Sequence, residues 1–175
     1  MNAPVAAETP QQGVAMTDAE RLAECKWIFE RQLQWSAATE VKVGVVATIE
    51  LAMVAGLGAI YMEAHQRSSW IVGSSMAFGI CAVVTLFCAG MVLMPRVKGP
   101  SRSLVFFARI AALSAADYIT RLAATQHRDL LQDLSAQTHR NAEIACDKHW
   151  WVGRATMIAF LSALPWFVAV GLLAS

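Results

Sequence analysis

The amino-acid sequence predicts an all-α membrane protein with three transmembrane helices and a small helical cytoplasmic domain between the second and third. Hydrophobic residues make up 57% of the 175 residues and charged residues only 15%. A soluble domain is nearer half apolar and a quarter charged. The apolar residues are also concentrated in three runs, each long enough for a helix to cross a hydrocarbon core of ~30 Å.

The chain begins with two segments that are not membrane spans. Residues 1–16 are rich in Ala, Pro and Gln, lack the pattern of a signal peptide, and are predicted to be a disordered tail. Residues 17–42 are predicted to form an amphipathic helix. Thr17 and Glu20 have the spacing of a capping box at its start, and apolar residues then recur at three- and four-residue steps: Leu22, Cys25, Phe29 and Leu33. No Pro or Gly interrupts residues 17–43, so this helix is predicted to run into the first span. The sequence leaves open whether it lies on the membrane surface or packs on the polar segment.

The three predicted membrane spans are residues 43–62, 70–94 and 151–174. The second of them contains no charged residue, whereas each helix of a soluble bundle shows a polar face to water. Trp70 begins the second span, and Trp150 and Trp151 lie at the start of the third. Indole rings favour the headgroup level of a bilayer, so these positions fit the predicted span ends.

Basic residues predict the orientation of the spans. The turn between the first two spans carries only Arg67 and His65. The amphipathic helix and the segment of residues 95–150 are far richer in basic residues: Arg21, Lys26, Arg31, Lys42, Arg96, Lys98, Arg102, Arg109, Arg121, Arg128, Arg140 and Lys148. The positive-inside rule therefore places the N-terminus and the 95–150 segment in the cytoplasm and Ser175 outside.

The segment of residues 95–150 is predicted to be helical. Residues 104–110 form a short apolar stretch, interpreted as either a strand or a helix at the membrane interface. Ser114 is a good N-cap for a helix over residues 115–125. A longer helix is then predicted to continue into the third span, because no Pro or Gly interrupts residues 126–151.

Composition and motifs argue against several classes of function. A net charge of +1 gives no basic field for nucleic acid. The four cysteines form no C-x-x-C pair, so they are interpreted as small apolar residues and not as a zinc or disulfide framework. No Ser/His/Asp or Cys/His grouping and no Gly-rich phosphate loop is present. The chain is therefore not expected to be an enzyme or to need a metal or cofactor.

Glu50 is the most informative single residue, because it lies in the middle of the first predicted span. A charged acid at the bilayer centre costs at least a few kcal/mol on an isolated helix. Two interpretations remain: a pore-lining or gating acid, or a neutral acid hydrogen-bonded between subunits. Ala52 and Gly56 form a small-xxx-small pattern that allows close helix approach. Thr85 in the second span is interpreted as a packing hydroxyl or one that bonds its own helix backbone.

Three stretches of the chain resemble the Pycsar effector transmembrane proteins. T-E-V-K-V-G at residues 39–44 is similar to the family's D-x-K-A-G lead-in. F-F-A-R-I-A-A-L-S-A-A-D-Y-I at residues 106–119 resembles Y-F-G-x-I-x-x-L-S-x-x-E-Y-L. D-L-L-Q-D-L-S-A-Q-T-H at residues 129–139, followed by I-A-C-D-K-H, resembles the third part, and the resemblance covers roughly residues 33–173. The chain departs from the family pattern at Glu40, Glu50 and Ala108, where Asp, a small polar residue and Gly are usual.

The resemblance implies an anti-phage effector of the bacterial inner membrane, with the cytoplasmic segment of residues 95–150 as its sensor. A partner pyrimidine cyclase would make the activating ligand, cUMP or cCMP, and the effector would then impair membrane integrity and cause abortive infection. Three spans enclose no pore alone, so a homo-oligomer is predicted. Two rival functions stay open: a non-enzymatic scaffold or accessory subunit of another complex, and a small membrane enzyme acting on lipids.

Given that ligand, basic and aromatic residues of the polar segment are the candidates for binding it. Guanidinium groups match phosphate oxygens with a charge-assisted fork, and aromatic rings offer a platform to the base. The candidates are Arg109, Arg121, Arg128, His139 and Arg140 for the phosphate, with Tyr118, Phe106 and Phe107 as the platform. The alternative is that these basic residues form a solvated face or contact anionic lipid.

Overall fold

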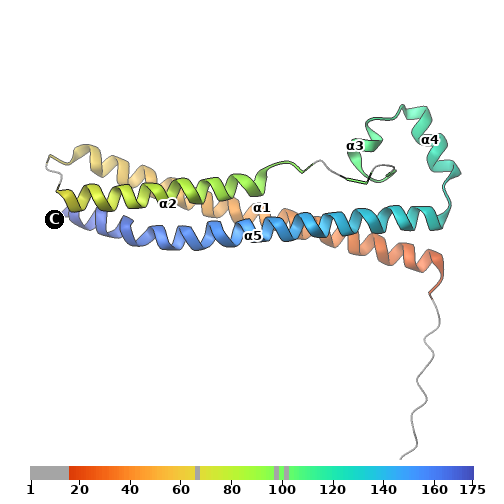
Figure 1. Ribbon diagram of the computed structural model, residues 1–175, viewed down its shortest axis with the longest axis horizontal. Helices are drawn as coiled ribbons and strands as arrows, with labels where there is room; N and C mark the ends of the chain where they lie inside the picture. The colour runs from red at the N-terminus through yellow and green to blue at the C-terminus, as the bar shows by residue number, and fades with distance from the viewer. Residues whose placement is uncertain (1–15, 66–67, 97–98, 101–102) are drawn as a thin grey trace, which may run out of the picture.

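The computed structural model describes residues 16–65, 68–96, 99–100 and 103–175. Its helices are α1 (Asp18–Glu63), α2 (Ser69–Leu93), α3 (Phe107–Ile110), α4 (Ala115–Ala124) and α5 (His127–Ala174) (Figure 1). The described part of the chain contains no strand, and α1, α2 and α5 are each long and apolar enough to cross a membrane. The predicted fold class is confirmed. The predicted tail lies outside the described residues apart from Met16, as do Arg67, Lys98 and Arg102.

The predicted capping box opens α1. The Thr17 hydroxyl accepts a hydrogen bond from the Glu20 N–H at 3.3 Å, and the Glu20 carboxylate accepts one from the Thr17 N–H at 2.7 Å. These bonds from the backbone and side chain of Thr17 lower the pKa of Glu20 because they stabilise its charged form. From this cap α1 runs 46 residues without a break, so the amphipathic segment and the first apolar run are one helix.

Helices α1 and α5 lie side by side and parallel along almost their whole length (Figure 1). Their side-chain contacts join residues 110 to 113 apart in sequence: Cys25 with Ser135, Ser36 with Lys148, Glu50 with Ser162, and Met53 with Trp166. A nearly constant offset is possible only for two parallel helices in one register. At 1.5 Å per residue, the pair is about 70 Å long. The first part of α1 therefore packs on the polar segment, one of the two placements that the sequence left open.

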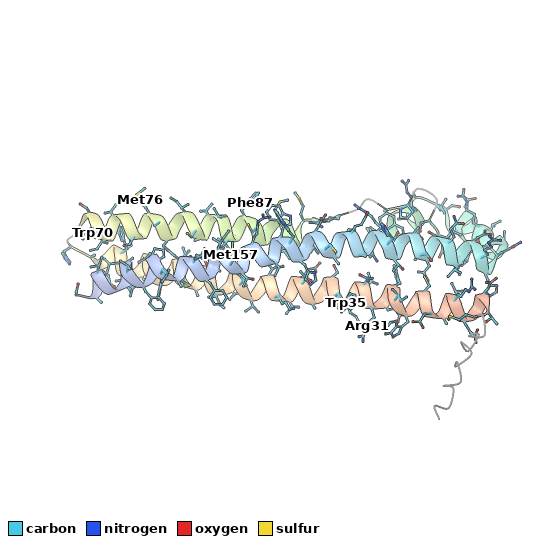
Figure 2. All side chains as sticks on the ribbon, turned by 60° about the horizontal axis from the view of Figure 1, so that its bottom comes forward. Arg31, Trp35, Trp70, Met76, Phe87 and Met157 are labelled. Carbon is cyan, nitrogen blue, oxygen red and sulfur yellow. The ribbon has the colours of Figure 1, made fainter. Side chains whose placement is uncertain are left out.

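Helix α2 divides the molecule into two halves. It returns antiparallel to α1 and packs on α1 and α5 only in the apolar half, which consists of residues 43–63, α2 and residues 151–174 (Figure 1). The other described residues form the polar half. In Figure 2, Met76 and Phe87 lie on the outer side of α2, and their exposed fractions are 64% and 60%. Such side chains contact lipid when the apolar half is in a membrane.

In the polar half, α3 and α4 fold back over the first turns of α5 (Figure 1). The 104–110 stretch is not a strand, and only Phe107–Ile110 is helical. The predicted cap of α4 is confirmed, because the Ser114 hydroxyl accepts a hydrogen bond from the Asp117 N–H at 3.1 Å. The Leu104 N–H donates to the Asp133 carboxylate at 2.7 Å, which ties the loop before α3 to α5.

Candidate functional site

A layer of three polar side chains crosses the centre of the apolar half, one from each long helix. An apolar cluster at one end of this half joins Val43, Cys88, Ala89, Val92 and Ala155; a second, nearer the other end, joins Leu57, Phe78, Ala82 and Ala169. Glu50 lies seven residues from Val43 and from Leu57, and Ser162 lies seven from Ala155 and from Ala169. Thr85 falls between the two α2 contributions. About two helical turns of α1 and of α5, and slightly less than one turn of α2, therefore separate this layer from the apolar cluster on either side.

We call Glu50, Thr85 and Ser162 the polar layer, and all three have an exposed fraction of 0%. The Ser162 hydroxyl lies 3.2 Å from Oε2 of Glu50 and 2.8 Å from the Ala159 carbonyl oxygen. It has one proton, so it donates to one of these oxygens at a time or shares the proton between them.

Two oxygens of the polar layer lack a hydrogen-bond partner among the described residues, Oε1 of Glu50 and Oγ1 of Thr85. Ser74 in the same helix as Thr85 donates to the Trp70 carbonyl at 2.8 Å, as an isolated membrane hydroxyl usually does. Thr85 makes no such bond to its own helix, so of its two sequence interpretations the structure supports the packing hydroxyl. Buried oxygens without partners are costly and mark the layer as a candidate site.

The sequence identified Glu50 but not its two neighbours. Ser162 carried no separate signal, because a serine in an apolar run is common. A usable signal was the seven-residue step from Ala155 to Ser162 to Ala169, which repeats the step from Val43 to Glu50 to Leu57. This repeat is informative only if α1 and α5 are known to be parallel partners, and a single sequence does not show that pairing.

A second cluster of polar side chains lies where the polar half meets the apolar half. The Lys148 ammonium donates to the Glu40 carboxylate at 2.5 Å and to the Ser36 hydroxyl at 3.2 Å. Lys148 is 8% exposed and Thr39 is 1% exposed, so the cluster is part of the α1–α5 interface. Nδ1 of His149 lies 3.5 Å from the Thr39 hydroxyl and 2.9 Å from the Ala145 carbonyl oxygen. These bonds fix the register of the two helices at their midpoint.

The predicted ligand residues divide into two groups. Arg109 on α3, Arg121 in the last turn of α4 and Arg128 in the first turn of α5 are all exposed, at the end of the molecule that α2 does not reach. Tyr118 is half-buried, and its hydroxyl donates to the Leu104 carbonyl at 3.3 Å. Of the two phenylalanines, Phe106 is buried and Phe107 is 63% exposed.

His139 and Arg140 belong to the other group, further along α5. Arg140 lies 12 residues after Arg128, about 18 Å along the helix, so one small ligand on that helix cannot contact both. Arg140 donates to the Glu143 carboxylate at 2.8 Å, and His139 lies 3.8 Å from the same carboxylate. The hydrogen bond from Arg140 lowers the pKa of Glu143. Among the described residues, no group of three His, Cys, Asp or Glu side chains is placed to hold a metal ion.

The fold defines the class of protein. Three long apolar helices, two of which extend as a parallel pair into a polar half, make this an all-helical, multi-pass membrane protein. A family model described as the Pycsar effector protein domain matches residues 24–175. The chain belongs to this family, which places it among the membrane effectors of anti-phage defence.

A curated relative agrees with this assignment. The chain is 26% identical to the Pycsar effector protein PtPycTM from Propioniciclava tarda over 144 residues, which cover 77% of this chain and 71% of the relative. No solved structure matches the chain. The family resemblance seen in the sequence is confirmed.

Proposed function

We propose that this protein is a cyclic-nucleotide-activated effector that impairs the bacterial inner membrane during phage infection. In this proposal the activating ligand is cUMP or cCMP, made by a partner pyrimidine cyclase, and the chain itself is not an enzyme. Loss of membrane integrity then stops growth before the phage matures. The family supports the anti-phage role, and the helix geometry supports the way a signal reaches the membrane.

The observation that carries the proposal is the unbroken α5 helix, paired with α1 in one register from the polar half to the far end of the apolar half. A helix pair of this length moves as a unit, so a shift or rotation at α3 and α4 reaches the polar layer. The ligand drives such a change only if it binds one of the two arrangements more tightly than the other. Pro165 lacks an N–H to donate and lies three residues after Ser162, which weakens α5 next to that layer.

We place the polar half in the cytoplasm, where the nucleotide would be made. Among the described residues, basic side chains are far more frequent in the polar half than in the turn between α1 and α2, and by the positive-inside rule this supports the orientation. The interface tryptophans agree with this placement. Trp70 lies at one end of the bundle (Figure 2), and Trp150 and Trp151 lie in α5 at the boundary between the two halves.

We propose that Arg109, Arg121 and Arg128 contact the cyclic phosphate. They come from three successive elements, α3, α4 and the start of α5, and all three are exposed. A ligand that bridges these elements would change where α3 and α4 lie relative to α5. His139, Arg140 and Tyr118 are the remaining candidates, and in this structure each has a partner within the chain.

We assign Glu50 a role in the step in which a path through the membrane opens. A three-helix bundle with a packed centre encloses no pore, so we propose that several copies assemble and that Glu50 lines or gates the path between them. An acid in that path would favour cations over anions. The small residues Ala52 and Gly56 are available for close approach of a second copy, because a Cβ at Gly56 would contact nothing within 4 Å.

Dye release from liposomes tests this function. Full-length protein is reconstituted, and leakage is measured with cUMP, with cCMP and with cAMP as the purine control. We expect leakage only with a cyclic pyrimidine nucleotide. Leakage that is indifferent to nucleotide, or absent with both pyrimidine nucleotides, would overturn the proposal.

Binding measurements on purified protein test the site separately. Arg109→Ala, Arg121→Ala and Arg128→Ala are each expected to weaken binding by 10-fold or more, because a charge-assisted bond to phosphate contributes about 1.5–3 kcal/mol. Arg21→Ala on the exposed face of α1 is the matched control and should bind as the parent does. Parent-like binding by all three variants would place the ligand elsewhere.

A further inference from the structure

The polar layer has an acidic residue and no basic one. Glu50 is the only Asp, Glu, Lys, Arg or His between residues 43 and 62, α2 has none, and residues 155–174 of α5 have none. The nearest basic side chain within the predicted spans is Arg154, eight residues before Ser162 and so about 12 Å away along the helix. Arg154 is exposed and stacks on the Trp150 ring at 3.1 Å. No side chain of the apolar half is therefore placed to neutralise a charge on Glu50.

The layer also has acceptors that no described residue satisfies. Oε1 of Glu50 and Oγ1 of Thr85 are buried without a hydrogen-bond partner, and Ser162 has a single proton to offer to Oε2. The three oxygen-bearing side chains lie at one level of the bundle, on three different helices, and are fully buried. An uncompensated carboxylate in this place would cost several kcal/mol, so a positive charge from solution is needed to balance it.

We propose that the polar layer is a binding site for one small monovalent cation, held by Glu50 with the hydroxyls of Thr85 and Ser162. The cation is either a proton or an alkali-metal ion. In the first case an O–H bond forms at Oε1 of Glu50. Since that oxygen and Oγ1 of Thr85 are not bonded to each other in the structure, a side-chain rotation then lets the new hydroxyl donate a hydrogen bond to Oγ1 of Thr85. In the second case the carboxylate and the two hydroxyl oxygens are ligands of the ion, as oxygen donors are for hard cations.

The site concerns a different ligand from the nucleotide, so it goes beyond the proposed function. A bound cation ties α1, α2 and α5 together at their centre and thereby stabilises the closed bundle. Loss of the cation leaves a charged acid between three apolar helices, which favours separation of the bundle. Cation occupancy in this site is thus linked to the stability of the closed state by mass action.

Infrared spectroscopy of the full-length protein in lipid vesicles distinguishes the two cations. At pH 7 exposed carboxyl groups are ionised, so a protonated-carboxyl band reports a buried acid. If the ligand is a proton, this band is present in the parent, lost in Glu50→Gln, and shifted in Thr85→Val. Thr48→Val is the matched control. Thr48 lies only two residues from Glu50, but its hydroxyl donates to the Gly44 carbonyl of its own helix and not to the polar layer. It should leave the band unchanged.

If the ligand is an alkali-metal ion, the band is absent, and the midpoint of thermal unfolding rises when choline chloride is replaced by NaCl or KCl. That rise is then lost in Glu50→Gln and reduced in Thr85→Val. Two results would overturn the proposal: a parent protein with neither the band nor the salt-specific rise, or a band that persists in Glu50→Gln. Both variants preserve side-chain volume, so at least one is expected to fold.

Discussion

The contact between Glu40 and Lys148 gives the sharpest prediction about stability. The Lys148 side chain is 10% exposed and the Glu40 side chain 47% exposed, so Glu40→Ala leaves an ammonium group largely buried with only the Ser36 hydroxyl as acceptor. Breaking a fully buried ion pair costs about 3–5 kcal/mol, and a hydrogen bond to a charged group contributes about 1.5–3 kcal/mol. Because Glu40 is half-exposed and Ser36 remains, we expect Glu40→Ala to lower the free energy of unfolding by about 2 kcal/mol.

Reversible unfolding of the full-length protein in detergent micelles measures this loss. A double-mutant cycle with Lys148→Met isolates the pair, since Met retains most of the apolar stem and removes the charge. Glu30→Ala is the matched control on an exposed face of α1 and should change stability by no more than about 0.5 kcal/mol. If Glu40→Ala costs no more than the control, or if the cycle gives no coupling between the two residues, the register-fixing role of this contact is wrong.

Three further changes test other contacts. Trp166→Phe should lower the free energy of unfolding by about 1 kcal/mol in the same assay, because it removes the 2.9 Å hydrogen bond from the indole N–H to the Met53 carbonyl. An unchanged free energy of unfolding would show that this bond does not hold α1 and α5 together. Thr17→Ala should cost about 1 kcal/mol of local stability at the start of α1, seen as faster hydrogen exchange in its first turns only. In Gly99→Ala the new Cβ would lie 2.6 Å from the buried Phe106 ring, so the loop before α3 must shift and should be cleaved faster by protease. An unchanged cleavage rate would refute this clash.

The loop before α3 shows how far local sequence signals reach. The cap at Ser114 was predictable, because a side chain that bonds the third backbone N–H is a local event. The stretch over residues 104–110 was not, since a short apolar run fits a strand or a helix equally well. Its conformation depends on Asp133, which accepts the Leu104 N–H from 29 residues away.

The candidate sites show the same division. Glu50 was identifiable from the sequence because an acid in an apolar run is unusual wherever the helix packs. Thr85 and Ser162 were not, because hydroxyls are common in membrane helices and become significant only when three helices bring them to one level. The link between Lys148 and Glu40 also depends on a parallel pairing across 108 residues.

The sequence by itself determined the class of protein, the number of apolar helices, the caps of α1 and α4, and the family, since composition, local hydrogen bonding and motif order are properties of nearby residues. Only the tertiary structure decided that α1 and α5 are parallel partners in one register and that Glu50 shares its layer with Thr85 and Ser162. The reason is physical. Lipid solvates an apolar helix equally on every side, so its apolar pattern does not specify which face meets another helix, and that choice is made by packing and by a few buried polar contacts.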